Sequence, residues 1–124
     1  MNLDLYKQIY LIGVGGIGMS ALARYFNAKG KNVCGYDKVK SDLCIEIENE
    51  GINIHYTDEV SAIPEAIKNS GYNDILIIYT PAIPKENKIF SFFRDKGFKI
   101  LKRAEVLGMI SKQSLWFSKK NIKT

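Results

Sequence analysis

Residues 9–26 hold the feature that most constrains this chain: a short apolar run, then a cluster of glycines, then a helical pattern. The apolar residues at 9–12 are enough for one buried strand. Four glycines follow within six residues, at positions 13, 15, 16 and 18. A strand, a glycine turn and a helix in this order predict a phosphate site, in which free N–H groups at the helix start point at the anion. A glycine turn that only packs the helix against the strand fits the same pattern, so both interpretations stand.

The glycines and one serine have separate expected roles in such a site. Gly13 can adopt the tight turn, and Gly15 lets the backbone come close to a diphosphate. Gly18 lets the helix pack against the strand. Ser20 lies in the first helical turn, where its hydroxyl can add a further hydrogen bond. Since the helix macrodipole places partial positive charge at the same point, we expect an anion to bind there.

The composition indicates one globular domain without a membrane segment. The 124 residues are 46% hydrophobic and 25% charged, which is ordinary for a soluble protein. No apolar run approaches the roughly 20 residues of a membrane span, and the first residues do not form a signal peptide. Cys34 and Cys44 follow no ligand pattern, so we expect buried thiols in a reducing cytoplasm. With His55 as the single histidine, we expect no metal site and no membrane partner.

The charge is unevenly distributed along the chain. Residues 1–93 carry 9 Lys and Arg against 11 Asp and Glu, whereas residues 94–124 carry 9 against 2. This basic end can face nucleic acid, an anionic substrate, another domain or solvent. No nucleic-acid recognition motif is interleaved with the basic residues, so we expect no nucleic-acid partner.

Strands and helices alternate along the sequence. Apolar runs predict strands at 7–13, 32–36, 52–56, 74–79 and 98–101, and helical patterns predict helices at 17–29, 42–50, within 57–70, at 87–96 and at 103–111. This alternation predicts an α/β fold of three layers, with a Rossmann-like, parallel, five-stranded sheet in the order 3-2-1-4-5. We expect residues 1–111 to form this domain. Residues 112–124 are predicted to form a basic tail or inter-domain tether, in which only Trp116 and Phe117 would dock.

Three features meet at the carboxyl edge of the predicted sheet, where ligands bind in such folds. They are the glycine turn, Asp37 after the second strand, and the loop at 80–84 after the fourth strand. Asp37 lies 19 residues after Gly18, a spacing at which an acid accepts hydrogen bonds from the ribose of NAD. A uridine diphosphate sugar offers donors to the same acid, and a loop acid that only begins a turn is the simplest interpretation. The residues alone do not choose among these three.

Four segments together resemble a known family. They are residues 12–23 (IGVGGIGMSALA), 35–37 (GYD), 79–84 (YTPAIP) and 101–107 (LKRAEVL). In this order and spacing they resemble, over residues 8–111, the amino-terminal domain of the Mur ligases, which make peptidoglycan precursors. The resemblance is greatest to the branch that joins L-alanine to UDP-N-acetylmuramate. A sister branch attaches a preformed peptide to the same sugar nucleotide, and that choice is made in domains outside these residues.

The resemblance implies that this domain holds the UDP part of UDP-N-acetylmuramate and carries no catalytic or metal-binding residue. Asp37 would face the uridine. Thr80, Pro81 and Ala82 would line the ribose and diphosphate side. The diphosphate would lie against consecutive residues of the glycine turn and the helix start: Gly15, Gly16, Ile17, Gly18, Met19 and Ser20.

For the whole enzyme, the resemblance implies that ATP, with Mg²⁺, phosphorylates the muramate carboxylate and releases ADP, and that L-alanine then attacks the acyl phosphate to form an amide and release phosphate. The product serves cell-wall biogenesis, and with it cell shape and division. The family's ATP-binding loop, Gly-Thr-His-Gly-Lys-Thr-Thr, does not occur in these 124 residues, and the Gly-Lys at 30–31 lacks its leading glycine and its Ser or Thr. We therefore expect the chain to bind the sugar nucleotide without a cofactor of its own and not to catalyse ligation.

Two residues remain open after this comparison. The family usually has a histidine a few residues past the third strand that helps to bind uracil. Asp58 or a neighbour stands there in this chain, and His55 lies inside the predicted strand, where a lone histidine is more often a strand residue than a ligand. Arg103 follows the last strand, where it can reach a phosphate or form a structural ion pair.

Two other functions compete with that of a ligase domain. An NAD-binding Rossmann domain of a dehydrogenase or redox sensor is supported by the acid after the second strand. A protein that uses this fold only for binding, without a ligase partner, is the second.

Overall fold

The computed structural model describes the backbone of residues 2–122 and the side chains of residues 2–113. Its centre is a five-stranded parallel sheet whose order, β3-β2-β1-β4-β5, confirms the prediction. The strands are β1 (Gln8–Ile12), β2 (Asn32–Tyr36), β3 (Asn53–His55), β4 (Ile75–Tyr79) and β5 (Lys99–Lys102). Because β1 pairs with both β2 and β4, the ends of these three strands, Ile12, Tyr36 and Tyr79, lie side by side.

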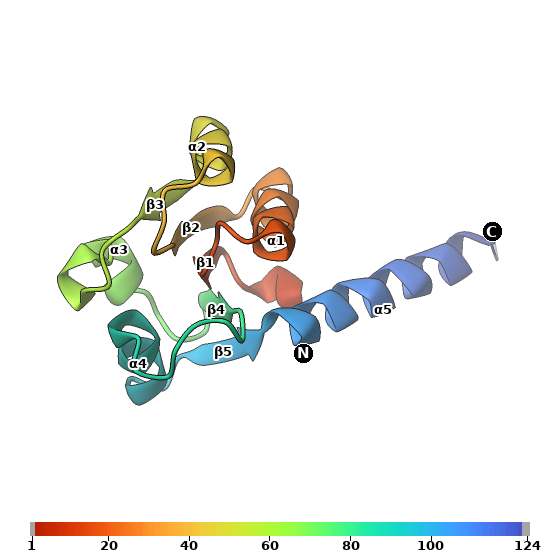
Figure 1. The fold of residues 1–124 in the computed structure, drawn as a ribbon. Coiled ribbons are helices and arrows are strands. Elements are labelled where there is room, and N and C mark those ends of the chain that lie inside the picture. The colour runs from red at the N-terminus through yellow and green to blue at the C-terminus, as the bar shows by residue number, and fades with distance from the viewer. Residues whose placement is uncertain (1, 123–124) are drawn as a thin grey trace.

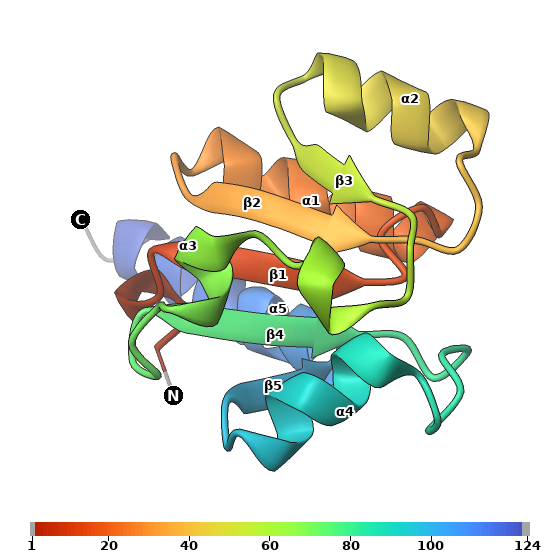
Figure 2. The ribbon, with the colours of Figure 1, turned by 90° about the vertical axis from the view of Figure 1, so that its left-hand side faces the viewer.

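Helices cover both faces of the sheet and complete the three predicted layers (Figure 1). The α-helices are α1 (Ile17–Ala28), α2 (Asp42–Asn49), α3 (Glu65–Lys68), α4 (Lys88–Asp95) and α5 (Arg103–Ile122), and short 3₁₀ turns span Leu3–Leu5 and Val60–Ala62. Figure 2 shows α1 and α5 on one face of the sheet and α3 and α4 on the opposite face. In the part of the chain that the structure describes, no helix is long and apolar enough to span a membrane.

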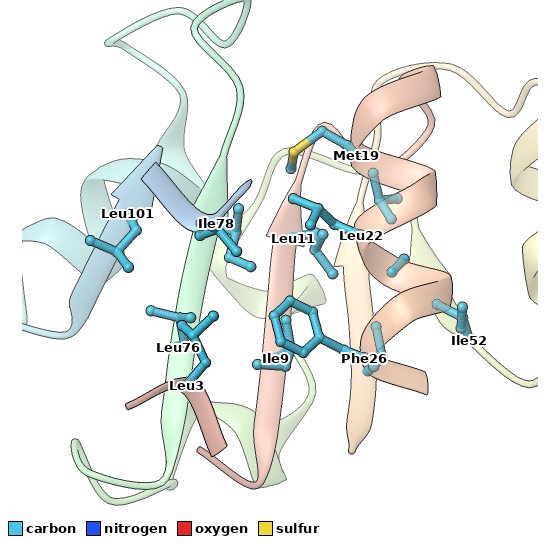
Figure 3. Close-up of a cluster of buried hydrophobic side chains, with 14 of the residues drawn as sticks. Leu3, Ile9, Leu11, Met19, Leu22, Phe26, Ile52, Leu76, Ile78 and Leu101 are labelled. Atoms are coloured by element: carbon cyan, nitrogen blue, oxygen red, sulfur yellow. The ribbon is translucent and has the colours of Figure 1, made fainter. Parts of the chain in front are cut away.

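The pleat of the strands divides the core into two clusters. On β1, Ile9 and Leu11 belong to the cluster under α1 and α5, whereas Tyr10 and Ile12 belong to the cluster under α3 and α4. Figure 3 shows the first cluster, in which Phe26 of α1 lies beside Ile9. The central strands are therefore apolar on both faces, as the sequence predicted for a covered parallel sheet.

The ends of the helices follow capping signals in the sequence. Ser41 caps α2, because its hydroxyl accepts the N–H of Cys44 at 3.2 Å. Gly30 follows α1 and Gly51 follows α2 with φ angles of 80° and 96°, values that favour glycine. These ends lie where the sequence predicted them.

The last helix is longer than predicted. The predicted end at Ser111 is wrong, because α5 continues to Ile122 and projects beyond the sheet (Figure 1). Residues 109–122 contain neither glycine nor proline, so the backbone meets no helix breaker, and a lack of acidic residues does not end a helix. The predicted docking of Trp116 and Phe117 lies outside the residues whose side chains the structure describes. The division at 111 between domain and tail stays a prediction.

Candidate nucleotide-binding site

The glycine turn joins β1 to α1 at the carboxyl edge of the sheet. Gly13 and Val14 donate their N–H groups to the carbonyl of Tyr36, at 2.8 and 3.0 Å, which extends the ladder one step past β1. Gly13 has a φ of 91°, and a Cβ there would lie 2.6 Å from the Cγ2 of Thr80. The tight turn predicted for Gly13 is therefore present, and only glycine fits it.

The start of α1 presents free backbone donors. The N–H groups of Ile17, Gly18 and Met19 have no acceptor among the described residues, and the first helical bond runs from Ser20 N–H to the carbonyl of Gly16 at 2.7 Å. The hydroxyl of Ser20 donates to the carbonyl of Ile17 at 2.9 Å, and its side chain is buried. Ser20 therefore closes the first turn from inside, and the three free amides form a cradle with partial positive charge.

A cavity of about 1020 Å³ opens at this edge of the sheet. It is lined by most of the predicted site residues: Gly16, Ile17, Gly18, Met19, Asp37, Thr80, Ala82 and Arg103. The predicted residues Gly15, Ser20, Pro81 and His55 are not among its lining residues. Sequence reasoning had placed Gly13, Ile83 and Pro84 at this edge and had named Asp58, without giving any of them a ligand contact. It missed the remainder of the wall: Tyr36, Lys38, Tyr56, Thr57, Glu86 and Asn87. Most of these lie next to residues that were predicted, so proximity along the chain was the available signal.

Arg103 begins α5 and lies directly over the cradle. A Cβ on Gly18 would come within 2.3 Å of the Nη1 of Arg103, so the guanidinium occupies the space that the missing side chain leaves. The role expected for Gly18, close packing of helix on strand, stays a prediction, and the atoms nearest to the missing side chain belong to Arg103. Within the described residues Arg103 forms no ion pair, and Glu105 instead accepts the backbone N–H of Lys102 at 3.0 Å. The cradle thus has a free cation beside it.

Asp37 is engaged by the backbone on both sides. Its Oδ2 accepts the N–H of Gly15 at 2.8 Å, and its Oδ1 accepts the N–H of Val39 at 3.0 Å. A Cβ on Gly15 would lie 2.8 Å from Asp37 Oδ2 and 2.7 Å from the Sγ of Cys44. A residue without a side chain is therefore needed at position 15 for the hydrogen bond to Asp37. The amide of Gly15 faces Asp37, and Gly15 does not line the cavity.

A second helix start borders the same cavity, but its amides are occupied. Asp58 accepts the N–H groups of Lys88 and Ile89, both at 3.1 Å. The Oδ1 of Asn87 accepts the N–H of Phe90 at 2.8 Å. All three donors in the first turn of α4 therefore have partners, whereas those of α1 do not. Of these two helix starts, only that of α1 offers free amides to an anion entering the cavity.

His55 lies in the sheet and is turned away from the cavity wall. Its Nε2 is hydrogen-bonded to the buried hydroxyl of Tyr10, and its Nδ1 is buried without a partner. Burial lowers the pKa of His55, and the backbone near Thr57 offsets this only in part. Burial also raises the pKa of Tyr10, so this pair is neutral near pH 7. This environment favours the interpretation of His55 as a strand residue.

The sheet order, the cradle at the switch point between β1 and β4, and the adjacent cation are typical of a doubly wound domain with an anion-binding site. The chain belongs to the Mur ligase family, because residues 8–114 match the family profile described as "Mur ligase family, catalytic domain".

Relatives named UDP-N-acetylmuramate–L-alanine ligase share about half of their aligned residues with this chain. The protein from Christiangramia forsetii is 52% identical over 112 residues, which is 90% of this chain and 25% of that protein. The protein from Parabacteroides distasonis is 51% identical over 114 residues, or 92% of this chain and 24% of that one. The chain thus spans about a quarter of the length of these relatives.

Solved structures give the same fold. A UDP-N-acetylmuramate-alanine ligase from Thermotoga maritima matches with a TM-score of 0.69 and 27% identity, over 86% of this chain and 23% of that one. A murein peptide ligase from Psychrobacter arcticus matches with a TM-score of 0.63 at 19% identity, over 77% and 18%, and shows the fold alone. The family match and these relatives support a ligase domain and not the dehydrogenase alternative.

Proposed function

We propose that this chain is the UDP-sugar-binding domain of a ligase that joins L-alanine to UDP-N-acetylmuramate in the bacterial cytoplasm, for peptidoglycan synthesis. Membership of the family and the names of relatives about 50% identical support this substrate. That the amino acid is L-alanine rests on those names alone, because in this proposal the amino acid does not contact the cavity of this chain.

One observation carries the proposal: α1 and α4 both begin at the cavity, and of these two helices only α1 has unoccupied amides in its first turn. The diphosphate would accept hydrogen bonds from the N–H groups of Ile17, Gly18 and Met19. The guanidinium of Arg103, held over Gly18, would add a charge-assisted hydrogen bond. Together they hold the sugar nucleotide by the part that all uridine diphosphate sugars share.

The uridine end would lie on the side of the cavity formed by Asp37 and the loop after β4. Thr80 and Ala82 line this side, and the exposed Pro81 stiffens the loop between them. Tyr36 and Asn87 complete the wall with polar groups next to apolar surface. A wall of this kind suits a planar base with several carbonyl groups.

ATP and Mg²⁺ belong to the whole ligase in this proposal and do not fit the residues present here. The described residues contain no group of three or more His, Cys, Asp or Glu side chains that could hold a metal ion. The 124 residues also lack the Gly-x4-Gly-Lys-Ser/Thr loop that binds nucleotide triphosphates. The chain's own contribution is to bind and orient the sugar nucleotide.

Calorimetric titration of the chain with UDP-N-acetylmuramate, UDP and NADH tests this function. We expect heat of binding with both uridine compounds and none with NADH. All three ligands carry a diphosphate, so the expected preference for uridine rests on membership of the family. Binding of NADH without binding of UDP would overturn the proposal and support the dinucleotide alternative.

A further inference from the structure

Asp37 joins the glycine turn after β1 to the loop before α2. It follows β2, and its carboxylate accepts one N–H from the glycine turn and one from the loop before α2. The carboxylate therefore joins two backbone segments, at Gly15 and at Val39, that are distant from each other in the sequence. The bonds measure 2.8 Å to Gly15 and 3.0 Å to Val39, within the range of strong hydrogen bonds to a carboxylate.

The surroundings of Gly15 are built for this contact. A side chain at position 15 would collide with the Oδ2 of Asp37 at 2.8 Å and with the buried Cys44 Sγ at 2.7 Å. Gly15 and Gly16 immediately precede the three free amides at the start of α1. The direction of those amides is therefore set by a turn whose backbone is tied to Asp37.

We infer that Asp37 is a positioning residue for the anion cradle: by holding Gly15 N–H, it fixes the glycine turn that aims the free amides of α1 at the diphosphate. This rests on the proposed function and deepens it, because the carboxylate acts at the diphosphate end without touching a phosphate. The same side chain can still face the uridine with its remaining lone pairs.

A positioning role for Asp37 can be told apart from two simpler roles by the change in pyrophosphate affinity when the carboxylate is removed. If Asp37 only bound the nucleoside, its loss would weaken binding of UDP and leave binding of inorganic pyrophosphate unchanged. If it were only a negative charge near the cradle, its loss would strengthen binding of pyrophosphate. A positioning role predicts that pyrophosphate binds more weakly although a repulsive charge has gone.

The test compares Asp37→Ala and the isosteric Asp37→Asn with wild type, titrating each with UDP and with inorganic pyrophosphate. Asp42→Asn, an exposed acid outside the cavity lining, is the matched control for the loss of one charge. We expect the affinity for pyrophosphate to fall about tenfold in both Asp37 variants and to stay at the wild-type value in Asp42→Asn. Unchanged or tighter pyrophosphate binding in folded Asp37 variants would overturn the inference.

Hydrogen exchange of the Gly15 amide gives a readout without ligand. We expect exchange at Gly15 to accelerate about tenfold in Asp37→Ala while amides of the β1–β4 pair keep their protection. If the wild type bound neither UDP nor pyrophosphate, the proposed function would fail, and exchange at Gly15 would still decide whether Asp37 holds the turn. Unchanged exchange there would refute the positioning role by itself.

Discussion

Arg103 and Gly18 show how one residue makes room for another at the candidate site. Gly18 has no side chain, and the guanidinium of Arg103 fills that space over the free amides of α1. Arg103 is half-buried and has no ion-pair partner among the described residues, so its charge is available to a ligand. This pair therefore places a free positive charge where the diphosphate is proposed to bind.

Replacing Arg103 by Ala is expected to weaken binding of UDP by about tenfold or more, because a charge-assisted hydrogen bond is lost. The thermal midpoint should change little, since no ion pair is broken. Lys102→Ala, an exposed cation next to it, is the matched control and should keep wild-type affinity.

Gly18→Ala should weaken binding of UDP by displacing Arg103, and it should cause no further loss in the Arg103→Ala background. Additive losses in calorimetric titrations would contradict this arrangement.

His55 predicts a pH dependence of stability. Its pKa in the folded chain is lowered by burial, so below the ordinary value of 6.5 the unfolded chain takes up the proton more readily. The free energy of unfolding should therefore be full above pH 6.5 and fall as the pH drops through the folded pKa. In His55→Gln this fall should be smaller in urea titrations at pH 7.5 and pH 5.5. An equal fall in both proteins would show that other groups cause it.

The glycine positions could be predicted from the sequence, but the neighbours of those glycines could not. The tight turn at Gly13 followed from local spacing. Gly15 and Gly18 were assigned to a phosphate and to a strand, whereas the structure gives them Asp37 and Arg103. Such contacts join residues far apart in the chain, and local spacing carries no information about them.

The helices α1 and α4 both begin at the cavity, but the amides of their first turns differ in hydrogen bonding. The first turn of α4 is capped twice, by Asn87 from its own N-cap position and by Asp58 from the loop after β3. The first turn of α1 is uncapped, with Gly16 as a residue that offers no side chain. Asn and Asp side chains satisfy the amides at the start of α4 and so stabilise that helix, whereas the uncapped start of α1 leaves its amides free for an anion.

Removal of the Asp58 carboxylate should destabilise the chain. Asp58→Ala leaves the N–H groups of Lys88 and Ile89 without acceptors, and loss of such a cap costs about 1–2 kcal/mol. We expect a lower urea midpoint for this variant. Asp95→Ala, at the opposite end of α4, removes a charge where the helix dipole disfavours one and should be neutral. Equal midpoints for both variants would contradict the double cap.

The extension of α5 shows a limit of composition. A basic stretch without acids suggested a tether, but helix formation depends on backbone chemistry and on the preceding helix. The first turns of α5 are anchored by the buried Val106, with Met109 and Ile110 packed against the same core. Gly108 lies within the anchored turns, and residues 109–122 contain neither glycine nor proline, so the helix continues to Ile122.

For the whole molecule, the order of the sheet was predictable and the depth of the cavity was not. Alternating strands and helices with right-handed crossovers leave few arrangements, so the order 3-2-1-4-5 followed from element order. The cavity wall also uses Tyr56 and Thr57 of the loop after β3, together with Glu86 and Asn87, and the sequence did not indicate these residues. Their contribution depends on Asp58 joining the loop to α4, a contact between distant residues.

In the proposed function, the free amides of α1, and not the capped start of α4, receive the diphosphate of a uridine sugar. Titration of the ¹⁵N-labelled chain with UDP-N-acetylmuramate tests it most directly. We expect the largest chemical-shift changes at the amides of Ile17, Gly18 and Met19 and at the Nε of Arg103. The amides of Lys88, Ile89 and Phe90 should shift less. The largest shifts on the amides of α4, with α1 unmoved, would contradict it.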